Sequence, residues 1–114
     1  MAIHWPLVRR SAVESILHAY LKESGQCAQA AKEIMPHATD QDNKAIKWKI
    51  RPKLGHGRCL APRASVGEKP WFFHVFVETE FHTVDGLTGI DGTPADDYLS
   101  AHFDHPDFIK QVRA

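Results

Sequence analysis

The run from Pro70 to Gly89 is the most apolar and aromatic stretch of the sequence, and it constrains the fold more than any other segment. Successive side chains of a strand point to opposite faces, and aromatic and β-branched residues favour strands. Both alternating sets of side chains in this run are mostly apolar. The run therefore predicts a central β-strand covered on both sides, followed closely by a second strand that ends at Asp85-Gly86.

Two ionisable side chains stand out within this run. His74 lies between Phe72 and Phe76 in the first predicted strand, where a buried imidazole must find a hydrogen-bond partner. Asp85 ends the second predicted strand. Each residue also has a simpler interpretation, as a core histidine and as a turn-forming aspartate.

Size and composition predict one soluble domain over residues 1–114. The chain has 14 Lys and Arg and 14 Asp and Glu, so no overall attraction to nucleic acid or membranes is expected. Cys27 and Cys59 lack CxxC spacing, and neither a signal-peptide pattern nor a long apolar run is visible. We expect free thiols and a cytoplasmic location by default, with delivery by a dedicated secretion system as an alternative.

Charge is unevenly distributed along the chain. The segment from Lys44 to Lys69 has eight Lys or Arg and one acid, whereas the segment from Glu78 to Asp107 has eight acids and no Lys or Arg. The simpler interpretation is that the two segments neutralise each other in the fold. The alternative is a basic patch that binds an anionic partner.

Two helices are predicted before the basic segment. Ser11 and Glu14 form a capping-box pattern, so a first helix should begin at Ala12 and end before Gly25. A second helix should begin at Gln26 or Cys27 and stop at Pro36. Cys27 then lies in a first helical turn, where the helix dipole favours a thiolate, although it is equally suited to be a small core residue.

The rest of the chain completes an α+β fold. Residues 46–51 alternate apolar and basic side chains and predict a half-buried strand, and residues 53–69 predict a long connection in which Cys59 begins a short strand. Thr93 and Pro94 predict a helix start, and residues 108–112 a last amphipathic helical turn. We expect N-terminal helices packed on a small, mostly antiparallel sheet of three to five strands.

The order of these residues resembles that of known enzymes. A Cys at a helix start (Gly25-Gln26-Cys27), a His in a central strand (Phe73-His74-Val75) and an Asp ending the next strand (Val84-Asp85-Gly86) follow one another. This pattern resembles the papain-like and transglutaminase-like cysteine hydrolases, including the small papain-fold domains of bacterial toxins and effectors. The chain departs from that pattern in having Ala28 after the cysteine and no glutamine well upstream.

The resemblance implies a catalytic triad. Cys27 would be the nucleophile, His74 would activate it, and Asp85 would orient His74. The backbone N–H of Cys27 and the side chain of Gln26 would stabilise the oxyanion. The expected reaction is hydrolysis or acyl transfer at a peptide or side-chain amide, without a cofactor or metal. The expected partners are a protein or peptide substrate and a cognate inhibitor or immunity protein, with no membrane partner.

Two other classes remain open. The basic segment 44–63, with Trp48 among its lysines, is compatible with a non-catalytic protein that binds nucleic acid, and an inhibitor or immunity protein is a variant of this class. A metal site would need the pairs His56 and Cys59 and His102 and His105, but their number and spacing fit structural zinc poorly.

Overall fold

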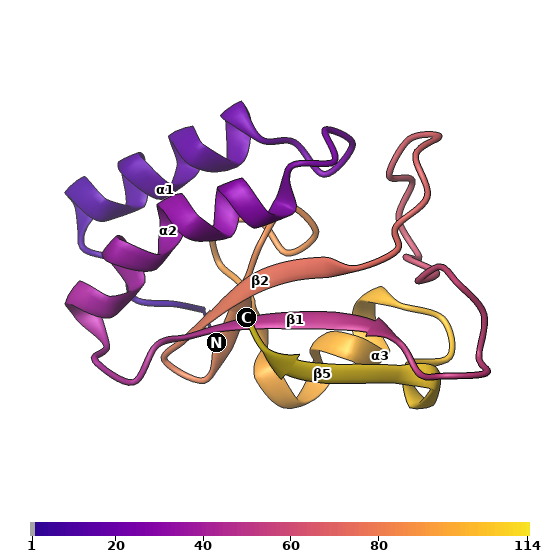
Figure 1. Cartoon of the computed structure of the whole chain (residues 1–114). Coiled ribbons are helices and arrows are strands. Elements are labelled where there is room, and N and C mark those ends of the chain that lie inside the picture. Colours follow the sequence, from indigo (N-terminus) through magenta and orange to yellow (C-terminus); the bar gives the residue numbers. More distant parts are fainter. Residues whose placement is uncertain (1) are drawn as a thin grey trace.

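An antiparallel five-stranded sheet lies between two layers of helices in the computed structural model, which describes residues 2–114 (Figure 1). The strands are ordered β4-β3-β2-β1-β5. Their bounds are β1 Ile46–Pro52, β2 His74–Thr79, β3 His82–Val84, β4 Thr93–Pro94 and β5 Ile109–Arg113. The helices are α1 Leu7–Ala19, α2 Cys27–Gln41 and α3 Tyr98–His102, with short 3₁₀ turns at Ala95–Asp97 and Pro106–Phe108. The predicted α+β class, with two N-terminal helices on an antiparallel sheet, is confirmed.

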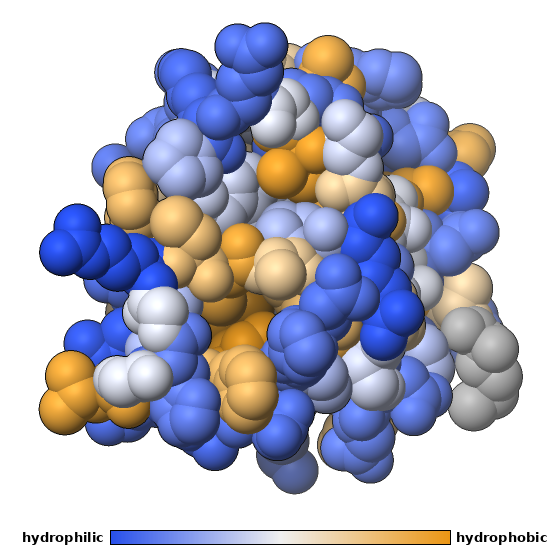
Figure 2. Space-filling model, turned by 90° about the vertical axis from the view of Figure 1, so that its right-hand side faces the viewer, coloured by the Kyte–Doolittle hydropathy of each residue, from blue (hydrophilic) through white to orange (hydrophobic). Residues whose placement is uncertain are grey.

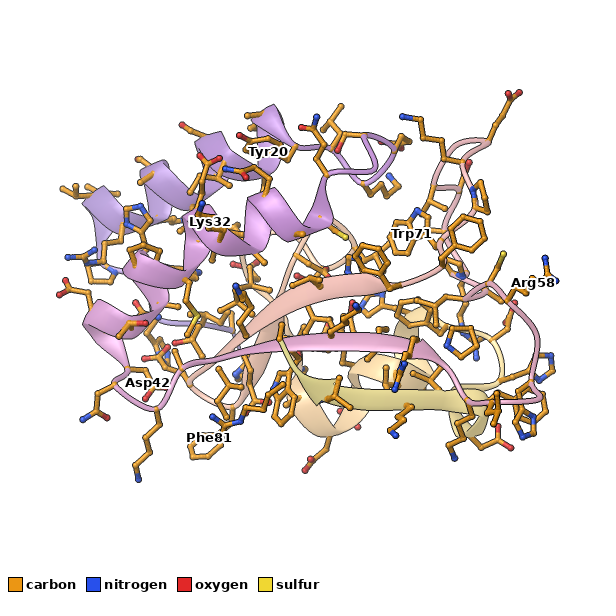
Figure 3. All side chains as sticks on the ribbon, viewed as in Figure 1. Tyr20, Lys32, Asp42, Arg58, Trp71 and Phe81 are labelled. Atoms are coloured by element: carbon orange, nitrogen blue, oxygen red, sulfur yellow. The ribbon has the colours of Figure 1, made fainter. Side chains whose placement is uncertain are left out.

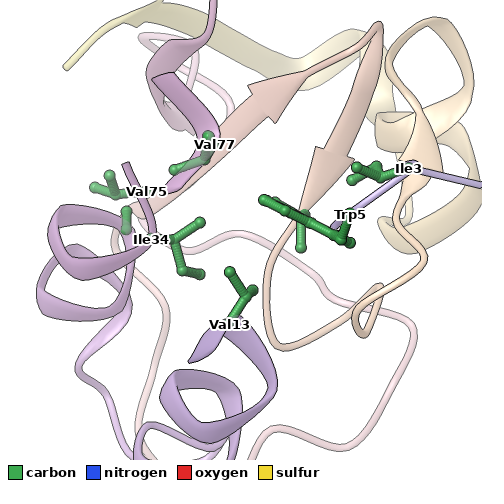
Figure 4. Packing of buried hydrophobic residues seen from close by; sticks show 9 residues of the cluster. Ile3, Trp5, Val13, Ile34, Val75 and Val77 are labelled. Carbon is green, nitrogen blue, oxygen red and sulfur yellow. The ribbon is translucent and has the colours of Figure 1, made fainter. Parts of the chain in front are cut away.

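The central strand β2 contributes to a hydrophobic core on each face of the sheet. On one face Val75 and Val77 pack with Ile34 of α2 and Val13 of α1 (Figure 4). On the other face Phe76 belongs to a second cluster, which includes aromatic side chains from the α3 region. The first four residues of β2 are all buried, which confirms that this strand is covered on both sides over residues 74–77.

The predicted bounds of the first helix are wrong at both ends. Helix α1 begins at Leu7, directly after its N-cap residue Pro6, whose carbonyl accepts the Arg10 N–H at 2.8 Å; no side chain caps this end. Glu14 consequently lies inside the helix and pairs with Arg10 at 3.1 Å. The helix ends at Ala19, and Gly25, with a φ of +74°, lies in the linker before α2.

Helix α2 does not stop at Pro36 but continues through it to Gln41. An internal proline removes one helical hydrogen bond, so tertiary contacts must stabilise the last turn. Ala38 is fully buried in the helix-side core, and the Asp42 carboxylate accepts the Glu80 N–H at 2.8 Å just beyond the helix. These contacts attach the C-terminal end of α2 to the β2–β3 hairpin.

Two predictions for the C-terminal part are also wrong. Residues 109–113 form strand β5 instead of a helical turn, because they pair antiparallel with β1. Thr93 does not cap a helix but lies in β4 paired with β3, and its hydroxyl bonds the ring of His102 at 2.8 Å. Long-range pairing therefore overrides the local helix signals in both places.

The connection before β2 is irregular, as predicted, but Cys59 does not begin a strand there. Strand β2 starts at His74, so Phe72 and Phe73 precede it and are exposed. No helix among residues 2–114 has the length and apolar character needed to cross a bilayer.

The β2–β3 turn is strained, which leads to a stability prediction. Glu80 and Phe81 have φ values of 50° and 62°, and Phe81 is 84% exposed at the hairpin tip (Figure 3). A side chain in this left-handed region costs about 1–2 kcal/mol. Phe81→Gly relieves this strain but adds the conformational entropy cost of glycine. The net effect should be an increase of about 1 kcal/mol in the free energy of unfolding, measured by urea denaturation. Leu54→Gly, at an exposed residue with an ordinary φ, is the control. If both variants change the free energy of unfolding equally, the Phe81 backbone is not strained.

Candidate active site

His74 and Asp85 form a buried pair at one end of the central strand. His74 is the first residue of β2, and Asp85 directly follows β3, which pairs antiparallel with β2. The Nε2 atom of His74 lies 2.7 Å from Oδ2 of Asp85, and both side chains are about 95% buried. The structure thus brings together the two ionisable residues that the sequence singled out in this run.

The carboxylate of Asp85 is held by several donors. The backbone N–H groups of Leu87 and Thr88 donate to Oδ1, each at 2.9 Å, and the hydroxyl of Tyr98 donates to Oδ2. Burial by itself raises the pKa of Asp85, but the hydrogen bond and charge of His74 and the Tyr98 and Thr88 donors outweigh it and lower the pKa. Asp85 therefore forms the turn and also carries a negative charge beside His74.

Cys27 completes the predicted set of three. It is the first residue of α2, it is free, and its side chain is partly exposed. Burial raises the pKa of the thiol, but the neighbouring ring of His74 and its charge, together with the Val75 and Ala28 backbones, lower the pKa below its usual value. For His74, burial lowers the pKa, whereas Asp85 and Cys27 together raise it to about 9. These shifts favour a thiolate–imidazolium pair.

The two ring nitrogens of His74 have different environments. Nε2 is bonded to Asp85, whereas Nδ1 is buried and forms no hydrogen bond to any described residue. Besides Asp85, the Cys27 thiol also interacts with the His74 ring and raises the pKa of His74. An imidazole fixed through one nitrogen, with the other unengaged beside a thiol, can take and return a proton.

Two further residues at this site were not found from the sequence. Trp71 stacks on the ring of His74, with centroids 4.6 Å apart and planes at 18°, and lies beside the start of β2 (Figure 3). Tyr98, the first residue of α3, donates its hydroxyl hydrogen to Asp85. Nothing in the local sequence signals these contacts, because Tyr98 is 13 residues away from Asp85 along the chain.

Gln26 does not join the other predicted residues. It is the N-cap residue of α2, it is exposed, and it does not line the cavity described below. Among residues 2–114 no side chain caps this end of α2, so the Cys27 N–H is one of its unpaired donors. The oxyanion roles of the Gln26 side chain and of the Cys27 N–H both stay predictions.

A cavity of about 230 Å³ opens beside the three residues. Cys27, His74 and Asp85 all line it, together with apolar side chains from α2, from β2 and β3, and from residues 70–73. Figure 2 shows a hydrophobic hollow with hydrophilic side chains around it at this end of the molecule. A substrate group can therefore be held next to the thiol.

Gly86 explains how the Asp85 turn meets the chain before α2. A Cβ at Gly86 would lie 3.2 Å from the backbone nitrogen of Lys22. Such a distance is tight for packed atoms, so the absence of a side chain lets the Asp85 turn and the linker from α1 to α2 approach closely. This contact helps to position the N-terminal end of α2 over the site.

The residues considered for metal binding are dispersed. No group of three or more His, Cys, Asp or Glu in the described part of the chain is arranged to hold a metal ion. The rings of His56 and His105 stack on Phe108, and His102 bonds Thr93. Cys59 is exposed and free.

Within residues 2–114, a single ion pair joins the basic and acidic segments, so most of their charges are not paired with each other. Of the eight Lys and Arg between residues 44 and 69, Arg63 alone forms one within the described chain, with Asp104 at 3.7 Å. Trp48 is not free to stack on a base, because its ring packs against the second core, its Nε1 donates to Glu78 at 3.0 Å, and Arg113 lies over it.

Comparisons with protein-family models, with curated proteins and with solved structures found no match to this chain.

The His74 pKa leads to a prediction for stability. Because the folded pKa of about 9 exceeds the ordinary value of 6.5, the stabilising contribution of His74 is complete below pH 6.5 and lost as pH rises through about 9. His74→Ala should therefore lower the free energy of unfolding by about 1–3 kcal/mol near pH 6, and by less near pH 9.5, in urea denaturation. His18→Ala, at an exposed residue, is the control. A pH-independent difference would contradict the pairing.

Proposed function

We propose that this protein is a cysteine hydrolase or acyltransferase with Cys27 as its nucleophile. The observation that carries the proposal is the Asp85-bound ring of His74 interacting with a thiol of lowered pKa beside a cavity. A lone cysteine or histidine has many structural roles, but this combination of orientation, charge and access meets the requirements of nucleophilic catalysis.

The first step is attack of the Cys27 thiolate on a substrate carbonyl. A carbon–sulfur bond forms, and the carbonyl π electrons move to oxygen to give an oxyanion. The unpaired backbone N–H of Cys27 at the start of α2 is the donor that stabilises this oxyanion. Asp85 keeps the His74 ring oriented and stabilises its positive charge.

The second step releases the leaving group. Nδ1 of the His74 imidazolium gives its proton to the departing amine as the carbon–nitrogen bond breaks, which leaves an acyl thioester on Cys27. Nδ1 then takes a proton from water or from a second amine, whose attack breaks the carbon–sulfur bond and restores the thiolate. Water gives hydrolysis and an amine gives acyl transfer.

The resemblance to papain-like and transglutaminase-like enzymes supports the same assignment. A helix that begins with the nucleophile, packed on an antiparallel sheet whose neighbouring strands supply His and Asp, is the arrangement that the resemblance implies. By the same resemblance we propose a papain-like domain of the bacterial toxin or effector type. Its partners would be a protein or peptide substrate and a cognate inhibitor.

The pH profile of Cys27 alkylation tests the proposal. Iodoacetamide should modify Cys27 rapidly at pH values well below the ordinary thiol pKa of about 8.5, because His74 stabilises the Cys27 thiolate. His74→Ala should slow this reaction at pH 6.5 by about tenfold for each unit by which the thiol pKa rises. Mass spectrometry of the modified peptides measures both cysteines separately.

Two internal controls accompany this measurement. Cys59 is exposed and free, so its alkylation rate in the same sample is the reference for an ordinary thiol. His18→Ala shows whether loss of an exposed histidine away from the site changes the Cys27 rate. If Cys27 reacts no faster than Cys59 at pH 6.5, or is unaffected by His74→Ala, it is a packing residue and the proposal is wrong.

A second candidate function is binding of an anionic partner through the basic segment 44–63. The observation in its favour is that Arg63 alone of its basic residues forms an ion pair in the described chain. Fluorescence anisotropy with labelled single-stranded DNA should then show an affinity that falls steeply between 50 and about 200 mM salt. Absence of binding at low salt would remove this candidate.

A further inference from the structure

The cavity beside Cys27 is apolar through most of its depth. Its inner wall is built from small and aliphatic side chains, namely Ala30, Ala31 and Ile34 of α2 with Val75 and Val84 of the sheet. Its volume of about 230 Å³ exceeds the roughly 150 Å³ of an engineered cavity that binds benzene. An aromatic ring or a branched aliphatic group therefore fits it.

The mouth of the cavity extends the same apolar character to the surface. Leu21, Phe72 and Phe73 line it, and they are 55%, 57% and 43% exposed. Large apolar side chains so exposed around a cavity next to a nucleophile are typical of a ligand-binding site. The apolar cavity and the thiol thus form one continuous site.

Apart from the group formed by Cys27, His74 and Asp85, the charged side chains that line the cavity are lysines. Lys22 and Lys69 line the cavity, and Lys49 lies over the ring of Phe73, with Nζ 4.7 Å from its centroid. Lys22 pairs with Glu23 at 3.2 Å, whereas Lys69 forms no ion pair within residues 2–114. The one carboxylate that lines the cavity is Asp85, which is already bonded to His74.

We infer that the substrate is a peptide with a large apolar side chain on the residue whose carbonyl Cys27 attacks, and with an acidic residue beside it. This inference rests on the proposed function. The apolar side chain fills the cavity, and the acidic residue lies near Lys69 and Lys49 at its mouth. Of the eight acids between Glu78 and Asp107, Asp85 alone lines the cavity, so this segment does not make the mouth acidic.

The same argument disfavours a glutamine side chain in the cavity. A buried primary amide costs free energy unless it is hydrogen-bonded. Beyond the catalytic residues, the lining side chains with polar groups are Tyr20, Lys22, Lys69 and Trp71, and none of them carries an amide or carboxylate that could pair with both ends of a glutamine amide. The Tyr20 hydroxyl already interacts with Glu33 and Gln29. The cavity therefore favours an apolar side chain over that of glutamine on the residue whose carbonyl is attacked.

Peptidyl chloromethyl ketones test this inference on the full chain with Cys59→Ser. The Cys27 sulfur forms a thioether with the methylene carbon while the carbon–chlorine bond breaks and chloride leaves. The probes are acetyl-Glu-Phe, acetyl-Glu-Gln and acetyl-Lys-Phe chloromethyl ketone. Each second-order rate constant is divided by that for iodoacetamide, which reports thiolate reactivity without using the cavity.

The Glu-Phe probe should react at least about tenfold faster than the Glu-Gln probe after this normalisation. Ala30→Leu fills the cavity and should remove most of that preference while the iodoacetamide rate is kept. Ala19→Leu, at an exposed residue of α1, is the matched control. Because Ala30→Leu risks misfolding, Phe72→Ala at the exposed mouth provides a second variant, and it should also reduce the preference.

The charge component is tested separately. Lys69→Glu should slow the Glu-Phe probe and accelerate the Lys-Phe probe, each severalfold at low ionic strength and less at high salt. Equal normalised rates for the Phe and Gln probes, with a fast iodoacetamide reaction, would overturn the apolar-substrate inference and leave the nucleophile intact. A lack of response to Lys69→Glu would overturn the acidic component. Slow iodoacetamide modification of Cys27 would instead contradict the proposed function itself.

Discussion

The buried hydrogen bond between His74 and Asp85 is the interaction on which the arrangement of the site depends. A charged pair in an apolar interior is unfavourable unless its remaining atoms are also satisfied. Here the turn after β3 supplies two backbone N–H donors, α3 supplies the Tyr98 hydroxyl, and Trp71 covers the imidazole ring. Each of these elements is therefore held in place by the pair as well as by the hydrophobic cores.

Strand β2 links this pair to the rest of the fold. Its interior residues divide between the two hydrophobic cores, and its first residue carries the imidazole. Helix α2 crosses the same strand, with its C-terminal end attached at Ala38 and Asp42 and its N-terminal end at the cavity. The distance between thiol and imidazole is consequently set by packing along a whole helix rather than by a flexible loop, which suits a preorganised site.

The surface around the thiol combines two properties that are usually separated. Apolar side chains line a cavity that reaches between α2 and the sheet, and lysines stand at its mouth, one of them paired with Glu23. The unpaired basic residues of β1 and of the following connection continue this charge away from the site. This positive charge favours acidic over basic groups at the end of the molecule where Cys27 lies.

Local sequence patterns were enough to predict the central strand and the two N-terminal helices, because composition and turn chemistry act over a few neighbouring residues. The same patterns singled out Cys27, His74 and Asp85 as candidate site residues. Tertiary structure decided what depends on distant contacts. It carried α2 through Pro36, since burial of Ala38 and a bond to Asp42 stabilise the last turn. It placed residues 109–113 in a strand, since β1 offered an edge for pairing. It also brought Tyr98 to Asp85 and left a cavity beside Cys27, because both result from packing between elements far apart in the chain.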